Sequence, residues 1–572
     1  MPVHRAAWPD WWSDGIGSAP LETAAVRAAQ TAAVAGDALQ AAARIHRAEL
    51  PGDLAAERGR ITEALVFSAE HTYGADDSVR DPLAQNTREQ WGEKASHAWE
   101  AVRRTRLHQE TLWGALEPSL GRGPSPTLAV FNPLGRRRDG LAVVNVDHEL
   151  WPPGRAVTLR DQDGREVPAQ PLGSRADGTT WALWLADVPP LGFATVTLEA
   201  GPAACPAPRA GDLAELASDH YRLDLDRERG TVRHLHDLDL GRDLVDPEAP
   251  WPLLACIHER LGNRHQLEHR RLTDVRREPL ADVRGDGAAD GPIWRSLAFT
   301  GASPGGAVLR WEIRLFKPTA RLEVRLSLRN PGTCDPEGWY VAWPLVLPGG
   351  RLRYQAQGGL VEPGRNQLPG SSSDWHAVQD LVSLVGDPGQ VVLSSAETLL
   401  WQFGGLNLGR FRPIARPAST HAYSWVMNNY WTTNFRASLA GEFRWGYALT
   451  SLRDRGEGAA VQAGQALRQP LLGRMLPPGA PRDHGPLTGL LTADLPCLER
   501  VSDASFAGVR AVRLHLREPD GARCTVPLRD ILDPARVVAL DRVDPLGRVL
   551  ATIDGGLELG PHERASVTVR LR

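Results

Sequence analysis

The chain has 572 residues, 42% of them hydrophobic, which is enough to fill several cores and predicts three or four domains. Its formal net charge of -4 gives no electrostatic reason to expect binding to nucleic acid or to an anionic membrane. No segment has the apolar length of a transmembrane helix, and the first residues lack the apolar core of a signal peptide. The five cysteines form no Cys-x-x-Cys pair, so we expect reduced thiols in a cytoplasmic protein.

Residues 1–118 carry the signals of a helical bundle. Ser18 is a candidate N-cap just ahead of Pro20, and a long Ala-rich run follows. Asp53 is placed to cap a second helix, and Trp91 begins the apolar face of a third. Because the helices are so rich in alanine, we expect this bundle to rest against a neighbouring domain.

From about residue 126 the apolar residues recur at every second position. The clearest cases are residues 311–315, 322–328 and 512–516, where apolar and charged or polar side chains alternate. Such alternation predicts antiparallel sheets with one buried and one exposed face, and hence β-sandwiches. The expected fold class is therefore mainly β with an N-terminal α-helical bundle. The predicted domains are the bundle at 1–118, a small sandwich at 119–205, a large sandwich at 206–485 and a C-terminal sandwich at 486–572.

An amide- and aromatic-rich run, Asn-Asn-Tyr-Trp-Thr-Thr-Asn-Phe, occupies residues 428–435. Amides can bind sugar hydroxyls, and indole or phenol rings can stack on the apolar face of a pyranose. The alternative is a buried amide network that ties a loop to a core. Asn428 and Asn429 suit the buried network slightly better, whereas Trp431 and Asn434 are the better candidates to face a groove. The loop around Asp374 and Trp375 is expected to line the same rim.

Several blocks, in chain order, resemble the region that follows the catalytic barrel of glycoside hydrolase family 38, the zinc-dependent α-mannosidases and their bacterial relatives. The blocks are the 428–435 run together with Trp8-Pro-Asp-Trp-Trp-Ser-Asp-Gly15, Glu70-His-Thr-Tyr-Gly74, Val130-Phe-Asn-Pro-Leu-Gly135, Leu240-Gly-Arg-Asp-Leu-Val-Asp246 and Asp544-Pro-Leu-Gly-Arg548. The resemblance implies that the large sandwich is of the galactose-mutarotase-like supersandwich type. It also implies that the N-terminal catalytic barrel is missing from this sequence.

The resemblance places the catalytic groups of such an enzyme on the barrel. There an aspartate is the nucleophile of a retaining mechanism, and a His-x-Asp pair holds most of a zinc site. None of the 17 histidines here is followed two positions later by Asp, so we expect no catalytic residue in this chain. His71 matches the family's loop histidine, with Thr72 where mannosidases have Asp. The resemblance implies that His71 is a zinc ligand and Tyr73 a substrate-binding residue in an assembled enzyme.

Two functions remain open from the sequence. The first is the C-terminal portion of a family 38-like, α-mannosidase-type glycosidase that needs a separate barrel chain or upstream sequence; zinc is expected only in that assembly, because one imidazole cannot hold zinc tightly. The second is a non-catalytic carbohydrate-binding or scaffold protein. A further pair, His234 and His236, has the spacing of a chelate on one face of a strand, but a solvated strand edge is the favoured interpretation.

Overall fold

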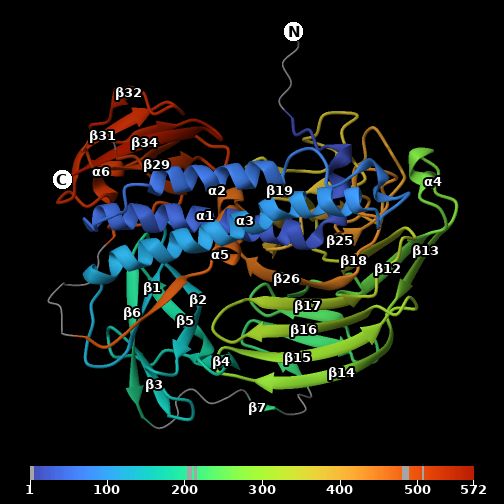
Figure 1. The fold of residues 1–572 in the computed structure, drawn as a ribbon, viewed down its shortest axis with the longest axis horizontal. Coiled ribbons are helices and arrows are strands. Elements are labelled where there is room, and N and C mark those ends of the chain that lie inside the picture. Colours follow the sequence, from blue (N-terminus) through green and yellow to red (C-terminus); the bar gives the residue numbers. More distant parts are fainter. Residues whose placement is uncertain (1–5, 202–208, 211–214, 480–488, 506–507) are drawn as a thin grey trace.

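The structure is a computed structural model that describes residues 6–201, 209–210, 215–479, 489–505 and 508–572 (Figure 1). It is mainly β, with a helical N-terminal region, and every strand pair in its described sheets is antiparallel. The predicted fold class is therefore confirmed. Among the described residues no helix is long and apolar enough to cross a membrane. The four described cysteines are free thiols, and Cys205 lies outside the described residues.

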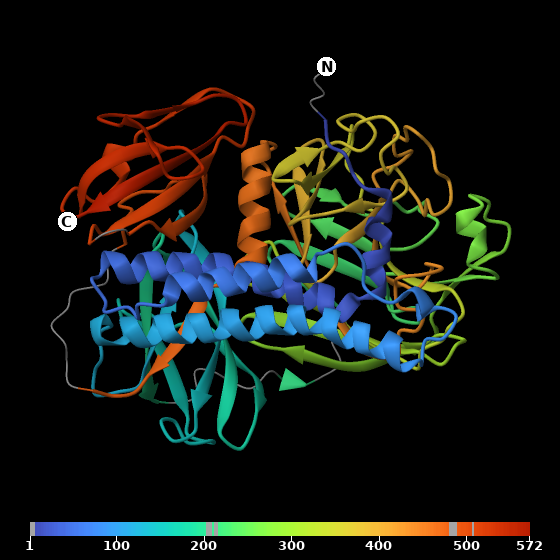
Figure 2. The ribbon, with the colours of Figure 1, turned by 45° about the horizontal axis from the view of Figure 1, so that its top comes forward.

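Three long helices form the N-terminal region and lie side by side across the molecule (Figure 2). They are α1 (Pro20–Ile45), α2 (Leu54–Ser68) and α3 (Gln85–Leu116). Three short 3-10 helices accompany them: η1 (Trp11–Ser18) precedes α1, η2 (Asp76–Ser78) lies between α2 and α3, and η3 (Glu117–Ser119) follows α3. The predicted cap at Ser18 is wrong: Ala19 is the N-cap of α1, and the Ser18 hydroxyl donates to the Gly15 carbonyl instead. Asp53 is the N-cap residue of α2, but its side chain makes no capping hydrogen bond.

Helix α1 is buried along most of its length because it packs on the sandwiches as well as on α3, as its alanine content predicts. Arg27 is buried, and its guanidinium donates to the backbone carbonyls of Ala396, Gln379 and Ser395 in the large sandwich. Further along, Asp37 pairs with Arg58 of α2 and with Arg500 of the C-terminal sandwich. The helix thus connects the domains that lie around it.

The small sandwich consists of two sheets. One has the strand order β27 (Leu472–Leu476), β1 (Thr127–Phe131), β6 (Phe193–Ala200) and β3 (Val157–Asp161), and the other β2 (Arg138–Asp147), β5 (Gly178–Val188) and β4 (Ala169–Ser174). Strand β27 lies within the 206–485 range assigned from the sequence to the large sandwich, yet it pairs with β1. It follows α5 (Glu457–Arg468) and brings the chain back from the large sandwich to the small one.

The large sandwich packs a ten-stranded sheet against a six-stranded sheet around one continuous core. The ten-stranded order is β20 (Gly359–Val361), β19 (Arg351–Ala356), β22 (Val382–Val385), β23 (Gln390–Ser395), β26 (Gly441–Leu452), β17 (Leu322–Asn330), β16 (Val308–Phe316), β15 (Trp294–Ala302), β14 (Ala281–Asp290) and β7 (Arg209–Ala210). The six-stranded order is β13 (Val275–Pro279), β12 (Cys256–Leu261), β18 (Glu337–Trp343), β25 (Ala422–Asn428), β24 (Leu400–Phe403) and β21 (His376–Ala377). A four-stranded sheet completes it, with β11 (Arg242–Asp243), β10 (Thr231–Asp237), β9 (Tyr221–Asp226) and β8 (Leu216–Ala217). The alternation predicted at 311–315 and 322–328 is confirmed, because its apolar members are buried in this core.

The C-terminal sandwich has a five-stranded and a two-stranded sheet. Their orders are β28 (Leu498–Asp503), β29 (Ala511–Arg517), β34 (Arg564–Leu571), β31 (Val537–Val543) and β32 (Val549–Thr552), and then β30 (Cys524–Val526) with β33 (Leu557–Leu559); a short helix, α6, spans Leu528–Ile531. Its core is continuous with apolar residues of α1, including Leu39 and Ile45. The C-terminal sandwich is thus a neighbouring domain against which the helical region buries its apolar residues.

Candidate functional site

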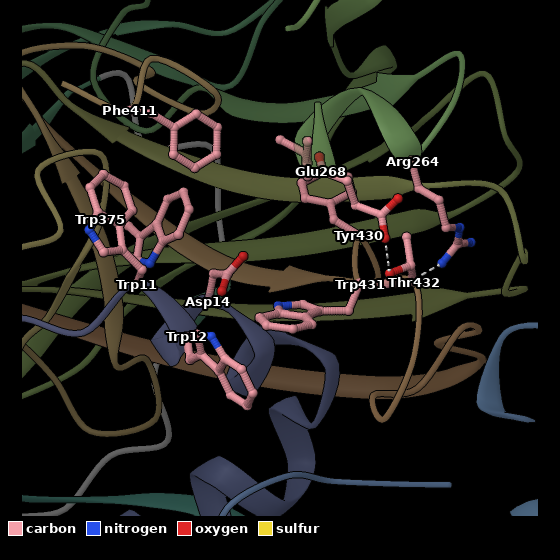
Figure 3. Close-up of a pocket in the computed structure, with 11 residues that line it drawn as sticks. Trp11, Trp12, Asp14, Arg264, Glu268, Trp375, Phe411, Tyr430, Trp431 and Thr432 are labelled. Atoms are coloured by element: carbon pink, nitrogen blue, oxygen red, sulfur yellow. Dashed lines mark hydrogen bonds between the residues drawn. The ribbon is translucent and has the colours of Figure 1, made fainter. Parts of the chain in front are cut away.

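An aromatic pocket of about 240 Å³ lies where η1 meets the six-stranded sheet (Figure 3). Its walls come from η1, from the loop after β25, from the turn at α4 (His265–Glu268) and from the segments around Trp375 and Phe411. The aromatic lining residues are Trp11, Trp12, Trp375, Phe411, Tyr430 and Trp431. The other lining residues are Asp14, Arg264, Leu267, Glu268 and Thr432.

Two glycines allow η1 to approach the 428–435 run closely. A Cβ atom on Gly17 would lie 2.2 Å from Nδ2 of Asn428, and one on Gly15 would lie 2.4 Å from the Phe435 ring. At the start of η1, the Asp10 carboxylate caps the helix by accepting from the Trp12 backbone N–H at 3.1 Å. The Trp11 indole N–H donates to the Gly370 carbonyl at 2.9 Å. The Trp-Trp-Ser-Asp-Gly block is therefore held against the large sandwich by the close packing of its glycine and by the hydrogen bond of the Trp11 indole.

Asn428 and Asn429 stand behind the pocket in the core, and both are fully buried. Nδ2 of Asn428 donates to the Asp14 carbonyl at 3.0 Å and so fixes the backbone of η1. Nδ2 of Asn429 donates to the carbonyls of Thr333, Asp335 and Ala437, at 3.1, 2.9 and 2.6 Å. These amides are engaged with backbone groups, which agrees with the buried-network interpretation and leaves no exposed amide for a ligand.

The aromatic walls are held by edge contacts and by backbone hydrogen bonds. Trp11 packs edge-on to Trp375 at 5.4 Å, and Trp12 packs edge-on to Trp431 at 5.3 Å between ring centroids. The buried Asp374 carboxylate accepts from the backbone N–H of Phe411 at 2.9 Å, although Phe411 has a φ of +46°. Such a backbone is costly for an aromatic residue, and it is held here by its contacts.

Two carboxyl groups line the pocket in different environments. Asp14 is buried, and burial raises the pKa of its carboxyl to about 7; the indole N–H of Trp431 offsets part of this rise. Glu268 lies at the open side, where hydrogen bonds from His265 and then Thr432 hold the pKa of its carboxyl below the usual value. The Thr432 hydroxyl donates to Glu268 at 2.6 Å. Near neutral pH the first group therefore titrates while the second stays ionised.

Arg264 is the cation of the pocket lining, but its guanidinium is engaged with the protein. It donates to the carbonyls of Asn429 and Trp431, at 3.0 and 2.8 Å, and to that of Cys334. Burial lowers the pKa of this group. Arg264 therefore fixes the backbone of the 428–435 run rather than facing the cavity with free donors.

The remaining predicted site residues gather beside the pocket. His71 is largely exposed, has a φ of +42°, and stacks on Trp12 at 5.9 Å. Tyr73 is buried against Phe435, and burial raises the pKa of its phenol to about 12. The Tyr73 backbone N–H donates to the Asn434 carbonyl at 3.2 Å. The structure thus brings the loop at 71–73 and the 428–435 run together, as the predicted site requires.

The sequence predicts a zinc ion only in an assembled enzyme, with the imidazole of His71 as one of its ligands. Within the described ranges, no group of three or more His, Cys, Asp and Glu side chains is arranged to hold a metal ion. Asp76 and Asp77 follow His71 by five and six positions, and both of their carboxylates form ion pairs with Arg80. The other candidate, His234, is half-exposed and pairs with Asp243.

The sequence predicts only two of the six aromatic lining residues at a rim, and it indicates neither the other four nor the charged members of the pocket. Trp431 and Trp375 were expected at a rim, and both line the pocket. Asp14 lies three residues after Trp11 in the Trp-Trp-Ser-Asp-Gly block, but nothing in the sequence indicates its burial. Glu268 and Arg264 belong to a turn between β12 and β13 that carries no local signal.

No protein-family model matches the chain, and a search of curated proteins finds no match. Among solved structures, an α-mannosidase from Enterococcus faecalis matches with a TM-score of 0.71 and 12% identity, over 100% of this chain and 69% of that one. The chain shares the fold of a glycoside hydrolase family 38 α-mannosidase. A protein described as glycosyl hydrolase family 38, also from Enterococcus faecalis, matches equally, with a TM-score of 0.71 and 12% identity over 98% of this chain and 71% of that one. The expected resemblance is thereby confirmed for the fold.

A galactose mutarotase-like protein from Lactobacillus casei matches with a TM-score of 0.25 and 10% identity, over 42% of this chain and all of the other. That score is too low to carry an argument. At 12% identity the family 38 match establishes a glycoside hydrolase-like fold, and not the reaction.

Proposed function

We propose that the chain is the carbohydrate-binding portion of a family 38-type glycosidase, and that the aromatic pocket binds a pyranose ring. The observation that carries the proposal is the pocket itself: six aromatic side chains and two carboxyl groups converge on one cavity. Indole rings stack on the apolar C–H face of a sugar, and carboxylates accept from its hydroxyls. A lining that is mostly aromatic with a few convergent polar groups is typical of a small-ligand site.

The complete reaction would be retaining hydrolysis of an α-mannoside, with the nucleophile and the His-x-Asp zinc ligands supplied by a catalytic barrel on another segment or chain. In that assembly His71 would offer one zinc ligand, and the residues described here offer no more. A docking surface for the barrel is available beside the pocket, where Trp12 is 50% exposed, and along the helices, where Phe67 and Trp99 are each 49% exposed. Contiguous exposed apolar patches mark interfaces, so these side chains are the ones to test for docking of the barrel.

The second candidate function is a non-catalytic carbohydrate-binding protein. It draws on the same observation, the aromatic lining of the pocket. Sugar binding by the pocket is common to both candidates. Activity with a barrel is what separates them.

The first experiment titrates the chain with methyl α-mannoside and uses its tryptophan fluorescence as the readout of binding. We expect saturable quenching, and at least tenfold weaker binding for Trp431→Ala, which corresponds to about 1.4 kcal/mol. Trp99→Ala is the matched control, because Trp99 is an exposed indole on α3 outside the pocket. Equal affinities for the two variants would overturn the assignment of the pocket.

The second experiment adds a barrel-containing polypeptide and measures hydrolysis of an aryl α-mannoside with zinc. Activity that appears only on mixing, and falls in His71→Ala, would support the glycosidase. Sugar binding without activity in any mixture would favour the binding protein. Turnover by the chain alone would contradict the expectation that its residues include no nucleophile.

A further inference from the structure

We propose that the aromatic pocket prefers a sugar that carries a protonated amine, with the ammonium group facing Asp14 and Glu268. This inference rests on the proposed function, because it names the class of sugar that the same pocket takes. It concerns the charge of the sugar that the pocket prefers, which is separate from the stacking of aromatic rings on a pyranose.

The first observation is the state of Asp14. Its side chain is 6% exposed and lines the pocket, yet no hydrogen-bond partner reaches its Oδ1 atom. Among the residues that the structure describes, no Arg, Lys or His forms an ion pair with it, and the like charge of Asp10 lies close enough to disfavour its ionisation. A buried carboxylate that lacks an ion-pair partner is costly, and a cation bound in the cavity would reduce that cost.

The second observation is the nature of the walls. Aromatic faces attract cations through the ring quadrupole, and rings grouped around a cavity are a known arrangement for ammonium ligands. The effect is already present at the edge of this pocket, where the Arg270 guanidinium lies 5.2 Å from the centre of the Phe411 ring. Figure 3 shows Asp14 between the Trp11–Trp375 pair and Trp431, with Glu268 on the opposite side of the cavity.

The third observation excludes the opposite charge preference. Arg264 is the cation of the lining, and its donors are directed at three backbone carbonyls. His265 pairs with Glu268 at 2.7 Å, outside the aromatic walls. An anionic sugar would therefore find two carboxyl groups and no free donor cation, whereas an amine finds two acceptors.

Because burial raises the pKa of Asp14 to about 7, its charge is fully developed only above neutral pH. Glu268 has a lowered pKa and stays ionised. The preference for the amine should therefore weaken as the pH falls from 7.5 to 5.5. It should not vanish, because Glu268 keeps its charge.

The experiment compares methyl α-mannoside with four derivatives, each with one hydroxyl replaced by a primary amine, by calorimetric titration at pH 7.5. We expect at least one amino sugar to bind ten times more tightly than the neutral parent. The ratio of the two affinities should decrease in Asp14→Asn and stay above one, because Glu268 keeps its charge, and it should also decrease in Glu268→Gln. Asp53→Asn, an exposed carboxylate at the start of α2, is the matched control and should keep the full ratio.

The outcomes separate the two proposals. If no sugar binds, the proposed function fails and the preference fails with it. If the neutral parent binds and no amino sugar binds better, only the amine preference is overturned. If Asp14→Asn does not fold, Glu268→Gln decides, and an unchanged ratio in that variant contradicts the proposal.

Discussion

The buried carboxyl of Asp14 should make the stability of the protein depend on pH in a way that Asp14→Asn removes. Its pKa rises from an ordinary value of 3.8 to about 7, a difference of about 3 units. Each unit corresponds to 1.36 kcal/mol, so ionisation of Asp14 costs the folded state at most about 4 kcal/mol. Between these two pKa values the folded state binds more protons than the unfolded state, and stability therefore falls as the pH rises.

Asparagine resembles the protonated acid in shape and carries no charge. Below pH 3.8 the variant and the wild type should therefore differ little, and above pH 7 the variant should be more stable by the full amount. Between pH 5 and pH 8 the gap should widen by about 3 kcal/mol, from the 2 units that separate pH 5 from the folded pKa. The assay is urea denaturation at both pH values, with tryptophan fluorescence as the readout of unfolding.

Asp53→Asn is the control for this measurement, because Asp53 is exposed and makes no capping hydrogen bond. It should change stability by less than about 0.5 kcal/mol at either pH. The reasoning is refuted if Asp14→Asn has the same advantage at pH 5 and pH 8, or if it is less stable than the wild type at pH 8. Either result would mean that Asp14 finds a compensating partner in solution.

Three other substitutions test the framework of the site. Asn429→Ala removes a buried amide that donates to one buried and two partly buried carbonyls, so it should lower the free energy of unfolding by about 3 kcal/mol. The control Asn86→Ala, on the exposed face of α3, should cost less than about 0.5 kcal/mol, and both are measured by urea denaturation. Arg27→Met removes the donors that join α1 to the large sandwich, so proteolysis within α1 should accelerate at least tenfold; an unchanged rate would contradict that role. Gly17→Ala places a methyl group 2.2 Å from Nδ2 of Asn428, so it should displace η1 and weaken methyl α-mannoside binding at least tenfold, and full affinity would show that η1 is not needed.

Much of the fold could be predicted because its signals are local. Alternation at every second residue arises from the strand itself, so it identified β16, β17 and β29 directly. The long Ala-rich run likewise indicated α1 and its need for a neighbour. The cap predicted at Ser18 is wrong because Ser18 is the last residue of η1, where its hydroxyl donates to the Gly15 carbonyl, and Ala19 is the N-cap of α1.

Strand β27 shows where local patterns stop being sufficient. Its five residues follow α5 in the chain, and nothing in them indicates whether they pair in the large or the small sandwich. The pairing with β1 depends on a partner more than three hundred residues earlier. Long-range pairing of this kind leaves no periodic trace in the strand that makes it.

The candidate site divides in the same way. Residue type alone indicates that the 428–435 run is suited to sugars or to a buried amide network, and it makes Trp431 and Asn434 the candidates to face a groove. Trp431 lines the pocket. Only the tertiary structure decided between the two for Asn428, by placing it against an η1 carbonyl 414 positions away. The packing of η1 beside the sandwich also buries the Asp14 side chain, and this burial raises the pKa of its carboxyl. Burial is a property of the assembled molecule, so the charge preference of the pocket could not be derived from the sequence.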